Sequence, residues 1–477
     1  MDELDFELIK KKTKVGVITL TSRTFLLQII AYFSTFLLTI LLSPNIFGIF
    51  IIVSAAVSFL KYFSDIGLAA ALVQKKQELS NDDLRTTFTI QFLLVVFFVF
   101  IAYLFSQKIV SFYKLDISGL WLFRALLLAF FLSSFKTIPS VILERKLDFN
   151  RLVIPEIVET IFFYLTVVYC AWKGLGVTSF TAGVLIRAIV GVVTIYLIAP
   201  WMPKFGIEKN SAKQLLKFGI PFQLNSLLAL LKDDLLILYL GATVGFSATA
   251  FIGWAKKWAE VSLRLIMDNI NKVSFPAFSR LQHSNIALAE TVEKAVFFVA
   301  LLTIPLVCGS MILIDSFVKI IPKYSKWEPA LFSFYLFSIS VIFASVSSLL
   351  TNMIQALGKV KITLKLMIMW TVLTWILIPP FIKIFGFNGV AIAMVLISLT
   401  SIVTLVIAKK LIHFSLKKAF KKPFIIGILT SGVMLVSRLL YPVSNVYQII
   451  IVLTSGMITY LICLFWFAKK EVISVFK

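Results

Sequence analysis

Near its start the chain has the basic segment Lys10-Lys11-Lys12-Thr13-Lys14, followed by VGVITLTSRTFLLQIIAYFSTFLLTILL, residues 15–42. An apolar run of about 28 residues is too long for the core of a cleaved signal peptide, and it is long enough to cross the ~30 Å hydrocarbon layer of a bilayer. The basic segment before it is typical of a cytoplasmic flank. We therefore expect an uncleaved first transmembrane helix that starts in the cytoplasm.

The composition of the whole chain matches this first segment. Of 477 residues, 60% are hydrophobic and 14% are charged, and 46 Lys and Arg against 23 Asp and Glu give a net charge of +23. Soluble globular proteins carry about 25% charged residues, so the composition excludes a water-soluble enzyme. It also argues against a nucleic-acid partner, because the cations stand between apolar runs and not on one soluble face. We expect an all-α polytopic membrane protein.

Apolar runs of membrane-spanning length recur about fourteen times along the chain. The connections between them alternate between Lys-rich and poorly charged, which places both termini in the cytoplasm. No connection is long enough for an independent soluble domain. The approximate spans are residues 15–42, 47–73, 86–106, 119–141, 152–172, 177–199, 214–240, 243–266, 290–314, 329–355, 361–384, 387–408, 423–441 and 446–468.

Three short similarities repeat in order along the chain, about 203 to 213 residues apart. The first relates Lys14-Val15-Gly16-Val17 to Lys217-Phe218-Gly219-Ile220. Such a repeat predicts two six-helix lobes, residues 1–205 and 206–412, followed by two further helices and a cytoplasmic tail in residues 413–477. Chance similarity among apolar helices is the alternative.

Charged side chains inside the predicted helices are the candidate functional residues. A lone cation at the centre of a membrane helix costs about 2.5–3.5 kcal/mol, so a basic excess at that depth indicates a hydrated cavity that receives an anion. A pyrophosphate group fits such a cavity, because Arg binds phosphate oxygens in a bidentate manner and Lys adds a point charge. The predicted cavity residues are Arg23, Lys61, Arg187, Lys256 and Lys257.

Acidic residues near these cations have two interpretations. Asp65, Asp233, Asp234 and Glu260 are candidates for coupling transport to Na⁺ or H⁺, or for pairing with cations. Local pairing is the simpler interpretation for Lys61 with Asp65 and for Lys256 with Glu260, which are four residues apart on a helix. Lys136, Glu156 and Glu159 lie near predicted helix ends, where long side chains reach the membrane interface.

The remaining polar features predict structural roles. Arg145, Lys146 and Arg151 flank a cytoplasmic turn, where they either anchor the protein to anionic membrane lipids or form a gate that contacts the substrate. Ser80 and Asp83 have the spacing of a helix capping box. Three dispersed cysteines and two isolated histidines give no disulfide framework or metal site, and no nucleophile accompanies the carboxylates, so we expect no catalytic site, metal or cofactor.

Four segments resemble a known transporter family. They are LSPNIFGIF (residues 42–50), FSDIGLAAALVQ (63–74), LERKLDFNRL (143–152) and FPAFSRLQ (275–282). In this order they are similar to the polysaccharide-transport family of oligosaccharide flippases, the Wzx-type and colanic-acid-exporter-like members of the MOP superfamily. The resemblance implies a V-shaped protein of the bacterial inner membrane. It further implies that the protein moves an undecaprenyl-pyrophosphate-linked oligosaccharide to the periplasmic leaflet by alternating access, for surface polysaccharide biosynthesis alongside a polymerase and glycosyltransferases.

Three other functions are weighed against this one. A lipid II flippase of the MurJ type would share the helix number and a basic cavity. A drug exporter of the MATE type would use an acidic cavity, whereas the first predicted helix has no carboxylate. A membrane-integral glycosyltransferase or polymerase would need large outer loops, and the longest, residues 315–328, offers little besides Lys319, Lys323 and Lys326.

Overall fold

A computed structural model describes residues 3–64, 66–224, 227–441, 445–469 and 471 of the protein. Within these residues all regular structure is helical, which confirms the all-α fold class. The reason is that a helix pairs its backbone N–H and C=O groups internally, as an apolar environment requires. The chain divides into two compact units, which we call unit 1 (Met1–Thr249) and unit 2 (Ala250–Lys477).

Unit 1 contains the first twelve α-helices and one short 3₁₀ segment. The helices are α1 (Glu3–Leu41), α2 (Pro44–Ser64), α3 (Leu68–Gln74), α4 (Asn81–Leu104), α5 (Ser106–Phe112), α6 (Ile117–Ser133), η1 (Ser134–Lys136), α7 (Thr137–Arg145), α8 (Phe149–Trp172), α9 (Thr178–Ile198), α10 (Lys209–Leu224), α11 (Leu227–Lys232) and α12 (Asp234–Thr243).

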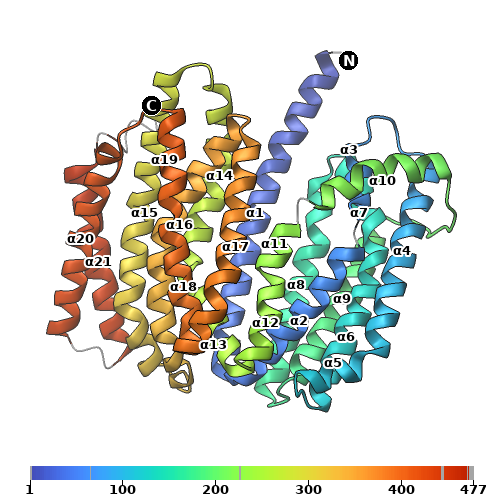
Figure 1. Ribbon diagram of the computed structural model, residues 1–477, viewed down its shortest axis with the longest axis horizontal. Coiled ribbons are helices and arrows are strands. Elements are labelled where there is room, and N and C mark those ends of the chain that lie inside the picture. Colours follow the sequence, from blue (N-terminus) through green and yellow to red (C-terminus); the bar gives the residue numbers. More distant parts are fainter. Residues whose placement is uncertain (1–2, 65, 225–226, 442–444, 470, 472–477) are drawn as a thin grey trace. The chain divides into compact units, whose positions relative to one another are not determined.

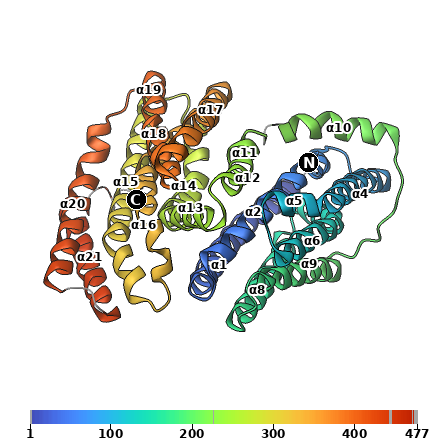
Figure 2. The same ribbon diagram turned by 60° about the horizontal axis from the view of Figure 1, so that its bottom comes forward.

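Helix α13 (Phe246–Ala259) leads from unit 1 into unit 2. Figure 2 shows α20 and α21 packed together against α15 in unit 2. The elements that follow α13 are α14 (Val261–Arg280), α15 (Asn285–Ile320), η2 (Ser325–Ala330), α16 (Leu331–Ala356), α17 (Val360–Phe385), α18 (Asn388–Leu399), α19 (Ser401–Leu411), α20 (Leu416–Leu440) and α21 (Val446–Phe467).

Twelve stretches of helix in the described residues are long and apolar enough to cross a membrane, so the expected count of fourteen is not confirmed. The two predicted spans without such a stretch are residues 214–240, of which residues 225–226 lie outside the described residues, and residues 243–266. Each is divided between separate helices. The first break falls at the charged residues Lys232 and Asp233, and the second falls at Glu260, between α13 and α14. The predicted division into lobes at residue 205 stays a prediction.

The core of unit 1 is apolar and depends on close helix approach. Leu122, Phe123 and Val167 are among its fully buried members. Helices α2 and α12 meet where Gly241 faces Ile52, and a Cβ at Gly241 would lie 2.7 Å from the Ile52 side chain. This contact joins α12, which comes after α10 and α11, to α2 near the start of the chain.

Helix α10 lies on the ends of other helices in unit 1. It packs on α3 and α4, as Figure 1 shows. Leu215 is buried on this face, whereas Lys213 and Lys217 are exposed on the other. At its centre the backbones touch, since a Cβ at Gly219 would lie 2.5 Å from the carbonyl oxygen of Ile66. The helix is thus attached along its length to unit 1.

Candidate functional site

Four charged side chains from four elements meet inside unit 1. Glu159 of α8 accepts a hydrogen bond from Lys136 of η1, with 2.6 Å between Nζ and Oε2. Its other oxygen, Oε1, lies 3.5 Å from Nη2 of Arg187, in the middle of α9. Lys61 of α2 is close enough to interact electrostatically with all three. We call Lys61, Lys136, Glu159 and Arg187 the cationic cluster, and its formal charge is 3 − 1 = +2.

The members of the cationic cluster differ in how they are surrounded. The Glu159 side chain is buried, with 7% of its surface exposed, whereas the Arg187 side chain is 48% exposed. Arg187 also lies over the ring of Phe163, 5.7 Å from its centroid, and Lys61 lies 5.8 Å from the ring centroid of Phe130. No carboxylate among the described residues is within ion-pair distance of Lys61. The cluster therefore has two exposed cations, Lys61 and Arg187, and one buried carboxylate, Glu159.

The local sequence explains how the buried carboxylate of Glu159 fits between the helices. The helix before Lys136 tightens into a 3₁₀ turn over Ser134–Lys136, which places Lys136 beside α8 and α9. On α9, Gly191 leaves the space that the carboxylate fills, since a Cβ there would lie 2.0 Å from Oε2 of Glu159. Lys136 and Glu159 thus pair with each other between the helices. That their side chains lie near the membrane interface stays a prediction.

A second ion pair stands beside the cationic cluster. Arg23 of α1 binds Glu156 of α8 through Nη1 and Oε2, 2.5 Å apart. Glu156 precedes Glu159 by three residues on the same helix. Because this pair is neutral, the predicted cavity residue Arg23 adds no net charge to the site.

The predicted cavity residues of unit 2 lie at the break between α13 and α14. Glu260 at the break is 3.9 Å from Nζ of Lys256 and 3.2 Å from Nη2 of Arg264. Lys256 and Glu260, interpreted from the sequence as a local pair, thus lie within ion-pair distance of each other. Lys257 is the neighbouring residue and also has an interaction partner. Contact of Lys256 or Lys257 with a substrate stays a prediction.

The predicted coupling residues fall on irregular segments. Asp65 lies outside the described residues. Asp233 is exposed at the break between α11 and α12, and Asp234 begins α12. Binding of Na⁺ or H⁺ at these carboxylates remains a prediction, as does the pairing of Lys61 with Asp65.

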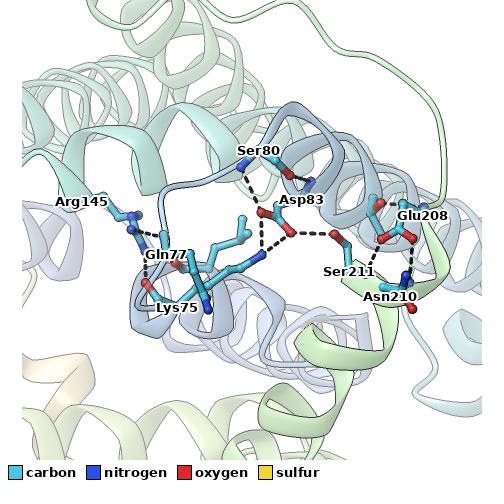
Figure 3. Close-up of polar contacts among 10 residues, drawn as sticks. Lys75, Gln77, Ser80, Asp83, Arg145, Glu208, Asn210 and Ser211 are labelled. Atoms are coloured by element: carbon cyan, nitrogen blue, oxygen red, sulfur yellow. Dashed lines mark hydrogen bonds and ion pairs between the residues drawn. The ribbon is translucent and has the colours of Figure 1, made fainter.

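Arg145 holds the polypeptide backbone at the end of unit 1 where α10 lies. Its guanidinium donates to the carbonyl oxygens of Leu72 at 2.8 Å, Lys75 at 2.6 Å and Gln77 at 2.8 Å (Figure 3). Arginine suits this position because its planar group carries five donors. The guanidinium donors are used on backbone carbonyls of the chain itself, so Arg145 is an anchor for residues 72–77.

The two other residues of the predicted gate are more exposed. Arg151 forms an ion pair with Asp148, 3.5 Å between Nε and Oδ2, across the start of α8. Lys146 is exposed. Contacts of Lys146 and Arg151 with lipid headgroups or with a substrate stay predictions.

Asp83 links the same segment to α10. It accepts hydrogen bonds from Nζ of Lys75 at 2.7 and 2.8 Å, from the backbone N–H of Ser80 at 3.0 Å and from the hydroxyl of Ser211 at 2.7 Å (Figure 3). The capping box formed by Ser80 and Asp83 is confirmed. The Asp83 side chain also joins three segments, through Lys75 after α3, Ser80 before α4 and Ser211 in α10. The spacing of the capping box alone does not indicate this.

The sequence pattern of the polysaccharide biosynthesis protein family matches residues 37–331, more than half of the chain. The chain belongs to this family. The match includes all four segments that carry the resemblance described above, as well as every member of the cationic cluster. It confirms the family that those segments indicate.

Individual relatives agree with the family. The chain is 24% identical over 277 residues to the teichuronic acid biosynthesis protein TuaB of Bacillus subtilis, and the match covers 57% of this chain and 56% of TuaB. It is 23% identical over 323 residues to the lipopolysaccharide biosynthesis protein WzxC of Escherichia coli, covering 67% of this chain and 65% of WzxC. The matched part thus spans slightly more than half of the first relative and about two thirds of the second.

Two solved structures of transporters have a similar fold. The lipid II flippase MurJ, in an inward closed conformation, superposes with a TM-score of 0.73 at 16% identity, covering 94% of this chain and 100% of that chain. An inward-facing multidrug resistance MATE transporter of the MOP superfamily gives 0.63 at 15% identity, covering 79% and 93%. At these identities the likeness establishes the fold alone.

Two members of the cationic cluster, Lys136 and Glu159, were not predicted as site residues. Lys136 is 23 positions from Glu159, and Glu159 is 28 positions from Arg187, so no helical spacing connects these side chains. The available signal was indirect. The pair Ser133-Ser134 with Pro139 marks an irregular helix before Lys136, and Gly191 one turn after Arg187 marks a close approach.

Proposed function

We propose that the protein is a flippase that moves an undecaprenyl-pyrophosphate-linked oligosaccharide across the bacterial inner membrane by alternating access, for surface polysaccharide biosynthesis. The cationic cluster is the observation that carries this proposal. Its excess positive charge lies within membrane-spanning helices, where it needs a counter-ion or a hydrated cavity. A pyrophosphate diester supplies the anionic partner, with Arg187 and Lys61 as its contacts.

The comparisons support a transported saccharide and leave its identity open. The names of TuaB and WzxC refer to the biosynthesis of cell-envelope polysaccharides, and a third relative, ExoT of Rhizobium meliloti, is a succinoglycan biosynthesis transport protein. In this proposal the protein is a transporter and not an enzyme, both termini are cytoplasmic, and a polymerase and glycosyltransferases act before and after it. Asp233 and Asp234 are the proposed sites for coupling to Na⁺ or H⁺.

The charge of the site also separates the competing functions. A cation exporter of the MATE type would need an acidic site, and the charge of +2 in the cationic cluster argues against one. Transport of lipid II would satisfy the same cations, but the family match favours a polysaccharide precursor. Loss of the protein therefore should remove a surface polysaccharide and leave peptidoglycan synthesis intact.

A complementation experiment tests the proposal. Arg187→Ala is introduced into a strain whose surface polysaccharide depends on this protein, with Lys173→Ala at the exposed end of α8 as the matched control. We expect the first variant to lose most of the polymer and the second to retain it, at equal amounts of protein in the membrane. Normal polymer from the Arg187→Ala strain would reject the site, and lysis on depletion of the protein would favour lipid II.

A further inference from the structure

The two cations that contact Glu159 are held very differently. Lys136 is 2.6 Å from the carboxylate and its side chain is 26% exposed, whereas Arg187 is 3.5 Å away and 48% exposed. Charge-assisted hydrogen bonds between nitrogen and oxygen are ordinarily about 2.7–2.9 Å long. The contact to Lys136 is therefore a full ion pair, and the contact to Arg187 is at the limit of a hydrogen bond.

Glu159 itself has little freedom to move. It is buried on α8, and its Oε2 fills the space that Gly191 leaves on α9. A Cβ at Gly191 would also lie 3.1 Å from Nζ of Lys136, so the ammonium is confined in the same gap. The buried ion pair is thus built into the packing of α8, α9 and η1.

Arg187 retains most of its hydrogen-bonding capacity. A guanidinium has five N–H donors, and the only carboxylate within 4 Å of it among the described residues takes one of them, at 3.5 Å. The exposed remainder of the side chain is available to a phosphate oxygen. An incoming anion would therefore attract Arg187 away from Glu159 at small cost, whereas Lys136 would stay.

We propose that Glu159 is a positioning residue that divides the cationic cluster between two tasks. It holds Lys136 as its permanent partner, and it keeps Arg187 loosely poised so that Arg187, together with Lys61, binds and releases the anionic headgroup of a lipid-linked substrate. This inference rests on the proposed function and adds a role for a carboxylate within a cationic site. The carboxylate also lowers the charge of the site from +3 to +2, which favours release, as a transport cycle requires.

The proposal predicts that removing the carboxylate strengthens binding and weakens transport. The probe is undecaprenyl pyrophosphate in nanodiscs that contain the purified full-length protein. Glu159→Gln keeps the side-chain shape and raises the charge of the site by one. We expect its Kd for the probe to fall about tenfold, which corresponds to ~1.4 kcal/mol, while polymer output in cells falls. A purely structural role would weaken binding and transport together.

Two further variants make the test specific. Glu156→Gln, three residues earlier on α8, removes the carboxylate paired with Arg23 and also raises the local charge by one, but it leaves the contacts of Glu159 with Lys136 and Arg187 in place. A Kd that falls as far as in Glu159→Gln would show that added charge alone strengthens binding, and would reject the positioning role. The double variant Lys136→Gln/Glu159→Gln restores the charge of +2 with two neutral side chains that can bond to each other. If Glu159→Gln alone fails to fold, the Kd of the double variant is measured in its place. Its Kd should return to near that of the parent protein.

The outcomes separate this inference from the proposed function. A folded Glu159→Gln protein whose Kd is unchanged or higher would reject the positioning role. A double variant that binds the probe much more weakly than the parent would show that Lys136 contacts the headgroup, and would reject the division of tasks. If Arg187→Ala leaves binding of the probe unchanged, the proposed substrate site itself is wrong.

Discussion

Replacement of Asp83 with Ala should strongly destabilise the protein. The Asp83 side chain is fully buried and accepts four hydrogen bonds, two of them from the ammonium of Lys75, whose side chain is only 18% exposed. Removal of one partner from a buried ion pair typically costs about 3–5 kcal/mol, because the other charge is left without compensation. We therefore expect Asp83→Ala to lower the free energy of unfolding by about this amount.

The neighbouring residue Asp82 provides a matched control. It forms an ion pair with Arg85, 3.1 Å from Oδ1 to Nε, but its side chain is 47% exposed. Exposed pairs contribute about 0.2–1 kcal/mol, so Asp82→Ala should change the free energy of unfolding by no more than that. Both variants remove a carboxylate from the first turn of α4, so any effect on the helix dipole is similar in the two.

A third variant isolates the connection to α10. Ser211→Ala removes one hydrogen bond to the carboxylate while Lys75 keeps its partner, and hydrogen bonds to charged groups contribute about 1.5–3 kcal/mol. The expected order of destabilisation is Asp83→Ala, then Ser211→Ala, then Asp82→Ala. Equilibrium unfolding of the purified full-length protein in mild detergent measures all three. If Asp83→Ala costs less than about 1 kcal/mol, or no more than Asp82→Ala, the assignment of Asp83 as a buried hub is refuted.

Three other predictions concern the same end of unit 1. Arg145→Lys should cost about 1.5–3 kcal/mol of unfolding free energy, because a lysine cannot bind the carbonyls of residues 72–77 at once; an unchanged value would show that the guanidinium fork is dispensable. Gly219→Ala should lower the free energy of unfolding by about 1–3 kcal/mol, since its Cβ would meet a backbone oxygen. At Gly432 a Cβ has open space, so Gly432→Ala should not lower the free energy of unfolding; equal effects of the two variants would contradict the close contact at Gly219. Backbone N–H groups of Ser211 and Asn210 hold the pKa of Glu208 below its ordinary value of 4.5, so its stabilising effect is present above that pH and is lost as the pH falls through the lower folded-state pKa. Glu208→Gln should therefore flatten the acid side of the stability profile measured between about pH 7 and pH 3, and a parallel profile would be evidence against this cap.

The sequence was sufficient for features that depend on local spacing. Apolar run length predicted the helical membrane fold, Ser80 and Asp83 predicted a capping box, and Lys256 with Glu260 predicted a local pair. Each of these depends on neighbours at most four residues apart or on composition over about twenty residues. The family also followed, because its segments are short and contiguous.

Features that join distant segments were not accessible in this way. Lys136 and Glu159 sit near the ends of their predicted spans, so partition to the interface was the natural expectation. What the sequence did not show is that they pair with each other, because the 3₁₀ turn and Gly191 create a polar gap between helices. The spans at 214–240 and 243–266 are not confirmed for a related reason. Total hydropathy does not register where one helix ends and the next begins.

The net charge of +23 illustrates why the number of cations in a membrane protein is a poor guide to its binding site. Arg145 and Lys75 lie at the end of unit 1, yet their donors are occupied by carbonyls and by Asp83. Lys136 lies within a membrane-spanning stretch, and its ammonium is paired with Glu159. Arg187 shares the same carboxylate, but at a longer distance and with most donors unused. The property that distinguishes a cation available to a substrate is therefore its unsatisfied hydrogen-bonding capacity at an exposed position, and its place within an apolar span alone does not reveal it. By this criterion Arg187 and Lys61 are the cations of unit 1 whose replacement should affect substrate binding more than stability, and Lys75, Lys136 and Arg145 are those for which the reverse should hold.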